Sequence, residues 1–532
     1  MTAAAPLSRA EQSAFEETSR YEDVRAFIGA LSRETKKVRV ETFGKSEEGR
    51  DLPLLVLGDP PAAAPAAPPH TLPVVLVMAN IHAGEVEGKE AVLHLARRMT
   101  IGDLQPLLRS AIWLFAPIYN ADGNERVSFD NRTEQNGPIG GVGTRENAKG
   151  LDLNRDFMKL ESAEARALVA LFTRWDPDVV VDLHTTNGSY HGYHLTYAPP
   201  LNPNTDARIS GFIRERLLPT VRESMMRQGW RTYDYGNFTT VASIEEELEA
   251  FAPGEARQKV WRTYDARPRF GGSYAGLRNR IAILSEAYSY LDFERRVKVT
   301  EAFVEEIVRF VAANADEIGV LTSRADSEWV DRGAPAEAGI SFGLRRLPSP
   351  MDILVGAVEA KVNPRSGKMM TAMVESAVTP TSMTVFDGFM TTAVRPVPRE
   401  YVMQPLPGDL HVTTARLLKA HGIRVEELAA ATRVTVDRFT IERVNHAERA
   451  FQGHKETSLA GRFERSTVEM PAGSIVVRTN QPLGRLVFYL LEPESNDGLT
   501  TWNVLDEALT VGATHPIVKS APGQTLQTRP SP

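Results

Sequence analysis

Short apolar runs and longer amphipathic segments alternate along the first part of the chain. Four near-continuous apolar runs have the pattern of strands that are buried on both faces: residues 74–78, 111–117, 179–183 and 281–284. Four other segments carry apolar residues at helical spacing: residues 87–99, 161–175, 209–228 and 299–312. This alternation predicts a mixed or parallel sheet that is covered by helices on both faces.

The segments that precede this alternation predict a helix and a hairpin. Residues 19–31 have an amphipathic helical pattern, and residues 38–43 and 52–57 predict two strands joined by a polar turn. Residues 59–70 consist mainly of Pro and Ala. Because proline cannot continue a β-ladder, this stretch predicts an exposed loop.

The pattern changes after about Ala325, where prolines interrupt short strand-like runs. The elements expected there include strands over residues 474–479 and 486–491 and a short helix near residues 416–430. We therefore predict two domains, an α/β domain over residues 1–322 and a β-rich accessory domain over residues 323–532. The length of 532 residues suggests two to four domains, since a domain has roughly 150 residues, and this division lies within that range.

Composition excludes several classes of chemistry. The chain has no cysteine, so thiol nucleophiles, disulfides and thiolate metal sites are excluded, and a zinc ion would need His and carboxylate ligands. The net charge of -7 is spread along the chain, so nucleic acid is not an expected partner. No stretch reaches the ~18 to 20 apolar residues of a membrane helix. The small residues and acidic start of the N-terminus resemble a mature terminus, which favours a secreted or periplasmic location over a cytoplasmic one.

Candidate metal ligands follow two of the predicted strands. His82 and Glu85 come just after the strand over residues 74–78, and His184 ends the strand over residues 179–183. Open α/β sheets place their ligand sites at this edge. Two imidazoles and one carboxylate would hold zinc and leave a position open for water. His191 and His194 follow closely and remain alternatives for the third ligand.

Two further signals fit a hydrolytic site. Asn154 and Arg155 are adjacent in a predicted turn, and a guanidinium can bind a carboxylate with two hydrogen bonds. The alternative is a structural arginine paired with Asp152 or Asp156. Glu286 follows the strand over residues 281–284, where a carboxylate can act as a base toward metal-bound water. Its alternative is a solvated acid at a strand end.

In this order the residues resemble the signature of the zinc metallocarboxypeptidases, the funnelin or carboxypeptidase A-like type. That signature has HxxE, an Asn-Arg pair, a later strand-terminal His and a late Glu. Residues 44–50 are similar to the early turn of this family, and residues 120–123 to its Asn-Pro-Asp-Gly loop. The resemblance covers about residues 20–315.

The resemblance implies an α/β/α sandwich with a mixed central sheet, one Zn²⁺ per chain and hydrolysis of a C-terminal peptide bond. The substrate would be a peptide or peptide-like molecule with a free C-terminal carboxylate. The roles that the matched positions would take are metal ligation by His82, Glu85 and His184, carboxylate binding by Asn154 and Arg155, and general base and acid catalysis by Glu286.

The family also uses an arginine to stabilise the oxyanion and a tyrosine to cap the substrate. For the arginine we prefer Arg132, with Arg145 as the second candidate and a substrate contact. For the tyrosine we expect Tyr274, with Tyr264 behind it, although simple packing explains either equally well. No residue is assigned to the base of the side-chain pocket, so the preferred terminal residue is not predicted.

Two other functions compete with a carboxypeptidase. A zinc-dependent deacylase of N-acyl amino acids would share the metal site, but the Asn154–Arg155 pair favours the peptidase. A non-catalytic peptide-binding relative would not need Glu286. The C-terminal region has no set of residues with ligand or triad spacing and is expected to serve packing, dimerisation or substrate gating, so a homo-oligomer is left open.

Overall fold

A computed structural model describes residues 5–59, 71–186, 188–248, 254–332, 335–524 and 526–531. The loop predicted over residues 59–70 lies outside these residues except for Asp59. Within the described ranges, no helix combines the length and apolar character needed to cross a membrane.

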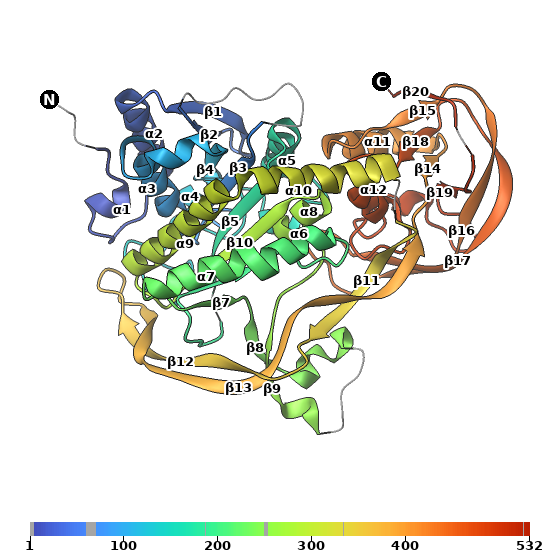
Figure 1. Cartoon of the computed structure of the whole chain (residues 1–532). Coiled ribbons are helices and arrows are strands. Elements are labelled where there is room, and N and C mark those ends of the chain that lie inside the picture. Colours follow the sequence, from blue (N-terminus) through green and yellow to red (C-terminus); the bar gives the residue numbers. More distant parts are fainter. Residues whose placement is uncertain are drawn as a thin grey trace.

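The first part of the chain forms an eight-stranded sheet in the order β1-β2-β4-β3-β5-β10-β6-β7 (Figure 1). Its strands are β1 (Val38–Lys45), β2 (Asp51–Leu57), β3 (Val74–Ala79), β4 (Ile112–Ala116), β5 (Val179–Thr186), β6 (Leu195–Ala198), β7 (Thr232–Asp234) and β10 (Ile281–Tyr288). Strands β4, β3, β5 and β10 run parallel to one another, whereas β2 and β6 pair antiparallel with β4 and β10. The sheet is therefore mixed, as the sequence predicts.

Helices cover this sheet in two layers. On one side α3 packs against α2 and α9, and α9 packs against α7; on the other side α5 lies against β1 and α8 against β5 and β10. The helices of this part are α1 (Arg9–Gln12), α2 (Tyr21–Glu34), α3 (Glu87–Ile101), α4 (Ala121–Glu125), α5 (Ala163–Trp175), α6 (Ala207–Phe212), α7 (Leu218–Arg227), α8 (Gly271–Leu277), α9 (Phe293–Ala313) and α10 (Ala315–Ser327). Every residue of β3 and β5 is buried, because both faces of these strands are covered. The predicted α/β/α sandwich is confirmed.

A second sheet joins the two halves of the chain. Its strands are β8 (Asn237–Thr240), β9 (Lys259–Arg262), β11 (Glu337–Arg346), β12 (Met351–Val362) and β13 (Met369–Pro396). The long strand β13 pairs with β12 and β11 and also, at Thr384–Phe386, with β9. Figure 1 shows the β12–β13 ribbon running under the α/β sandwich. Strands from before and after the predicted domain boundary thus share one sheet, and the division at residue 322 stays a prediction.

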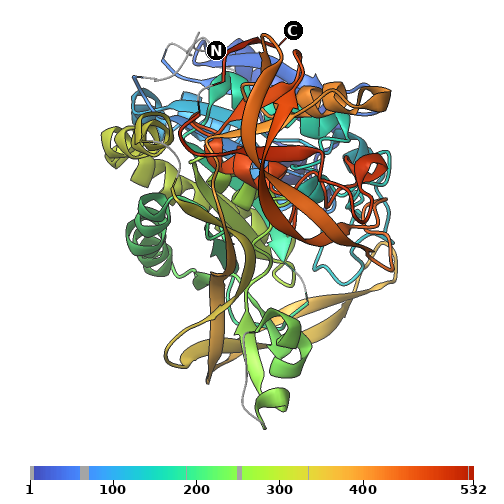
Figure 2. The ribbon, with the colours of Figure 1, turned by 90° about the vertical axis from the view of Figure 1, so that its right-hand side faces the viewer.

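The C-terminal region is β-rich, as predicted, and contains a seven-stranded antiparallel sheet in the order β17-β16-β19-β14-β18-β15-β20. Its strands are β14 (Glu400–Met403), β15 (Glu426–Leu428), β16 (Thr432–His446), β17 (Thr457–Met470), β18 (Ile475–Arg478), β19 (Ile517–Ser520) and β20 (Thr528–Pro530). Two helices accompany it, α11 (Leu410–Ala420) and α12 (Gly484–Leu491). Figure 2 faces this sheet, whose longest ribbon is the β16–β17 pair.

Two element predictions for this region are wrong. Residues 486–491 form the end of helix α12, not a strand, because an all-apolar run buried on every side has no period that separates the two. The helix expected near residues 416–430 is α11, which ends at Ala420. Gly422 follows it with a φ of 84°, a left-handed conformation that ends helices.

Candidate functional site

The predicted site residues meet at the carboxyl ends of adjacent parallel strands. His82 and Glu85 lie in the loop that follows β3, His184 lies near the end of β5, and Glu286 lies near the end of β10. The register of β5 and β10 places Glu286 directly beside His184. The sheet topology therefore gathers residues that are far apart in the sequence.

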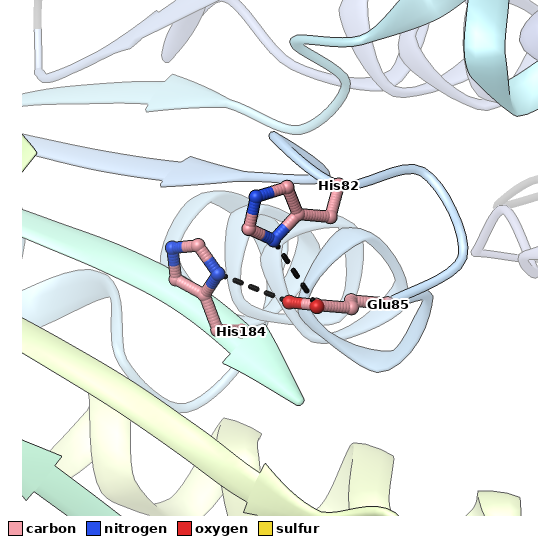
Figure 3. A group of neighbouring side chains, drawn as sticks. All are labelled: His82, Glu85 and His184. Atoms are coloured by element: carbon pink, nitrogen blue, oxygen red, sulfur yellow. Dashed lines mark hydrogen bonds and ion pairs between the residues drawn. The ribbon is translucent and has the colours of Figure 1, made fainter. Parts of the chain in front are cut away.

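Three of these side chains form a candidate metal centre (Figure 3). One ligand atom each from His82, Glu85 and His184 lies within 4.8 Å of the others, and all three residues are buried. The Nδ1 atoms of both rings face the Glu85 carboxylate, with Nδ1 of His82 3.1 Å from Oε1 and Nδ1 of His184 3.0 Å from Oε2. These two imidazoles and one carboxylate fit the donor set of a catalytic zinc site.

A carboxylate lies close to the far nitrogen of each imidazole. Nε2 of His82 is 3.0 Å from Oδ1 of Asp152, and Nε2 of His184 is 3.0 Å from Oδ2 of Asp182. Carboxylates in such positions fix the orientation and tautomer of metal-binding histidines. Sequence reasoning missed this role for both aspartates. For Asp182 a signal exists, since it lies two residues before His184 on the same face of β5.

The charges in the site favour an ionised ligand carboxylate. Burial opposes ionisation of Glu85, but His82 and Arg132 nearby and the hydrogen bond with His184 hold its pKa well below the usual range. Burial likewise opposes ionisation of Asp152, whose pKa the hydrogen bond with His82 and the charge of Arg145 lower. Both acids are thus ready to interact with cationic or metal-bound partners.

Glu286 is in a different electrostatic situation. Its surroundings in the protein raise its pKa to about 8, chiefly through burial and, less, through the charge of Glu85, while His184 acts in the opposite direction. A carboxyl group with a pKa near neutrality can both accept and donate a proton at physiological pH, which is what a general base and acid requires.

These residues line a cavity of about 320 Å³. Its walls carry His82, Glu85, His184, Glu286, Arg145, Asn154 and Arg155 together with apolar side chains that include Met78, Phe157, Phe172 and Leu284. The volume is that of a small ligand pocket. The cavity thus places the candidate metal centre, the acid and two cationic side chains around one space.

The Asn154–Arg155 pair is positioned by its neighbours. Oδ1 of Asn154 accepts a hydrogen bond from the main-chain N–H of Gly271 at 3.0 Å. The guanidinium of Arg155 lies 3.9 Å from the ring centre of Phe270 and is only 4.0 Å from Asp152 at its nearest, a weak ion pair. The structural pairing of Arg155 with Asp156 is absent from the described contacts, since Asp156 binds Lys159 and Ser162. Arg155 therefore lines the cavity with a weak carboxylate partner, while its Nη1 donates to the carbonyl oxygen of Asn154 at 2.7 Å.

The structure places Arg145, not Arg132, along the cavity wall. Arg132 binds Oε1 of Glu85, the carbonyl oxygen of Thr185 and Oε1 of Gln135, so all three of its nitrogen groups have protein partners. Arg145 donates from Nε to Oδ2 of Asp152 at 3.0 Å, and its Nη2 lies 2.8 Å from the same oxygen. Its Nη1 lies 3.6 Å from Oε1 of Glu85, and 41% of its side chain is exposed. Of the two candidates for the oxyanion contact, Arg145 alone lines the cavity.

Tyr274 does not reach the cavity, which corrects its expected contact with the substrate. Helix α8 turns the side chain into the core, where it is fully buried beside Phe157 and Phe172. Its hydroxyl lies 2.8 Å from Nδ1 of His421. The tyrosines that do line the cavity are Tyr235 and Tyr264.

The two alternative histidine ligands also lie elsewhere. His191 is buried against the ring of Tyr288, with a distance of 4.1 Å between ring centres. Nε2 of His194 lies 3.1 Å from Oε2 of Glu375 on strand β13. Neither belongs to the His82–Glu85–His184 group found among the described residues.

Comparison with known proteins agrees with this site. The family model for zinc carboxypeptidases matches residues 24–260, which include the three candidate ligands and the Asn154–Arg155 pair. Carboxypeptidase 2 of Trichophyton equinum is 23% identical over 94% of this chain and 86% of its own length. Carboxypeptidase Z of Mus musculus is 31% identical over a shorter stretch, 26% of this chain and 21% of its own.

Among solved structures, a metallo-carboxypeptidase from Pseudomonas aeruginosa, in complex with (2-guanidinoethylmercapto)succinic acid, is 20% identical with a TM-score of 0.37, over 56% of this chain and 69% of that one. The family model and the curated relatives agree on one activity class, and zinc carboxypeptidases depend on zinc. Residues 24–260 therefore match the zinc carboxypeptidase family, and the comparisons indicate that the chain is a metallopeptidase, a hydrolase.

Proposed function

We propose that the enzyme removes the C-terminal residue from peptides or peptide-like substrates that carry a free terminal carboxylate, with one Zn²⁺ bound by His82, Glu85 and His184. One observation carries the proposal. The His-Glu-His group, the acid Glu286 and the cation Arg155 all line the same cavity. Within it, a terminal carboxylate beside Arg155 would lie close to both the metal centre and the acid.

The bound zinc would supply a Lewis acid that activates water and polarises the scissile carbonyl. Glu286 would take a proton from the attacking water and deliver it to the leaving amine, a role for which its raised pKa suits it. Asp152 and Asp182 would hold the ligand histidines in orientation through their far nitrogens.

The two cationic side chains, Arg155 and Arg145, would have different roles. Arg155, with Asn154 beside it, would bind the terminal carboxylate, since a guanidinium matches a carboxylate in shape and charge. Arg145 lies on the wall that carries the ligands and would stabilise the negative charge that develops on the scissile oxygen. The apolar side chains around Phe157 and Phe172 would surround the terminal side chain.

The test combines metal content with hydrolysis of matched substrates. We expect about one zinc per chain and cleavage of blocked dipeptides that stops on chelation and returns with zinc. Glu286→Gln should keep the metal and lose about 10³-fold or more in kcat, because the proton carrier is gone. Cleavage of N-acyl amino acids without cleavage of dipeptides would assign the deacylase function instead. A metal-free protein that is active, or a fully active Glu286→Gln variant, would refute the mechanism.

The carboxylate contact has its own test. Arg155→Ala should lower kcat/KM for free-acid peptides by about 10²-fold, and by far less for the same peptides as C-terminal amides, since only the acid presents an anion. Arg174→Ala, at an exposed position on α5, is the matched control and should change neither rate. Equal losses on acids and amides in Arg155→Ala would contradict the proposed contact.

A further inference from the structure

The β16–β17 ribbon of the C-terminal region ends in a turn that reaches the α/β part of the molecule (Figure 2). The tip is formed by Gln452 and Gly453, with φ angles of 50° and 83°, between Phe451 and His454, which pair across it. Two adjacent residues with positive φ are typical of a tight hairpin turn. The tip therefore holds its side chains at a defined position.

Two side chains of this turn contact the segment that carries the carboxylate-binding pair. Oε1 of Gln452 accepts a hydrogen bond from the main-chain N–H of Asp152 at 2.8 Å, across 300 positions of sequence. Nε2 of His454 lies 2.7 Å from Oε1 of Glu161. The turn thus touches residues 152–161 at the start and at the end.

Asp152 connects several parts of the site. Its Oδ1 lies 3.0 Å from Nε2 of His82 and accepts from the N–H of Asn154 at 2.9 Å, and its Oδ2 accepts from Nε of Arg145 at 3.0 Å. A shift of its backbone would therefore move a candidate ligand, the candidate oxyanion contact and the carboxylate-binding pair together.

A second set of contacts from the C-terminal region reaches the loop that binds Asn154. Arg269, which is 1% exposed, donates from Nε to Oδ1 of Asp497 at 2.8 Å and from Nη1 to Oε1 of Glu456 at 2.6 Å. Two residues on, the N–H of Gly271 donates to Oδ1 of Asn154. The C-terminal region thus supports both loops that hold Asn154.

We propose that Gln452 is a positioning residue of the active site, which fixes the main chain at Asp152 and through it the orientation of His82, Arg145 and Asn154. The C-terminal region is then a structural part of the catalytic site and not a separate module. This inference rests on the proposed function for its kinetic consequence, whereas the contact itself is measurable without activity.

The experiment compares three variants of the full chain. Gln452→Leu removes the acceptor at similar volume, and Gln452→Glu retains an acceptor oxygen. Gln524→Leu is the matched control, because Oε1 of Gln524 also accepts from a main-chain N–H, that of Thr435 at 2.9 Å, but inside the C-terminal sheet. Amide hydrogen exchange of the peptide containing Asp152 is measured without substrate, on metal-free and zinc-loaded protein, beside kcat, KM and Tm.

In Gln452→Leu we expect exchange at Asp152 to become at least about tenfold faster in both forms, and kcat to fall about five- to tenfold with a smaller change in KM. Gln452→Glu should restore the slow exchange and most of kcat, and Gln524→Leu should leave both at wild-type values. Tm of Gln452→Leu should match that of Gln524→Leu.

Unchanged exchange at Asp152 in Gln452→Leu would overturn the inference, as would faster exchange with unchanged kcat. A loss of kcat explained by an equal loss of folded protein would overturn it as well. If wild-type protein cleaves none of the peptides, the proposed function fails, while the exchange rates still decide whether Gln452 holds the Asp152 segment.

Discussion

At the scale of single residues, the environment of Glu286 predicts how kcat/KM depends on pH. Its environment raises its pKa to about 8, through burial first. A bound divalent cation nearby would favour the ionised form and lower this value. A general base must be deprotonated, so kcat/KM should fall as the pH drops. The pKa that describes this fall should lie between the ordinary glutamate value of about 4.3 and the raised value of about 8. A pH–rate profile measures this pKa, and a value below 4 would contradict the prediction.

At the scale of elements, the approach of α3 to β5 sets the spacing of the metal centre. A Cβ added to Gly88 would lie 2.7 Å from Cβ of Leu183, an atom fixed to the backbone next to His184. Gly88→Ala should therefore push α3 from the sheet, with an unfolding free energy lowered by about 1–3 kcal/mol and zinc bound about tenfold more weakly.

Gly319→Ala in α10 provides the control for Gly88→Ala. No atom lies within 4 Å of the added Cβ there, so this variant should be neutral or stabilising by up to about 1 kcal/mol. Urea denaturation and zinc titration of both variants make the comparison. Equal effects of the two substitutions would show that the contact with Leu183 does not set the geometry.

A second element-scale contact joins α1, α3 and α9. The buried His94 of α3 lies 3.3 Å from Glu11 of α1 and 3.3 Å from Glu301 of α9, with Arg97 and Arg98 of α3 beside the acids. Burial lowers the pKa of His94, but the hydrogen bonds and charges of Glu11 and Glu301 outweigh it and raise the pKa to about 9.

Because the pKa of His94 is higher in the folded state, its ionised form stabilises the fold. This stabilisation is complete below the unfolded pKa of about 6.5 and is lost as the pH rises through about 9. The loss of unfolding free energy in His94→Gln should therefore be about 2–3 kcal/mol larger at pH 6 than at pH 9.5. Denaturation of both proteins at the two pH values tests this, and equal losses would contradict it.

At the scale of the whole molecule, a buried ion pair joins the α/β part to the C-terminal region. Asp497, fully buried, accepts from the main-chain N–H of Arg269 at 2.6 Å and from its Nε at 2.8 Å. Asp497→Ala should lower the unfolding free energy by about 3–5 kcal/mol, because it leaves the Arg269 charge buried without this partner. Asp437→Ala removes an exposed pair with Arg465 of similar geometry and should cost under about 1 kcal/mol. Similar losses in denaturation experiments would contradict the difference.

Much of the site was predictable because its residues carry local signals. His184 and Glu286 stand at the ends of apolar strands, and such strands in an α/β pattern predict where side chains gather. The choice between Arg132 and Arg145 had no such signal, since both lie in one irregular loop and differ only in their partners across the fold. Tyr274 was misplaced for the same reason: its direction depends on how α8 packs.

The sequence by itself determined the alternation of buried strands and helices and the order of chemistry-bearing residues along them, because hydrophobic periodicity is a local property. Only the tertiary structure decided which arginine lines the cavity, which aspartates lie beside the histidines, and that Gln452 contacts Asp152. These are contacts between residues distant in the chain, and they arise when separate elements pack, which no short stretch of sequence records.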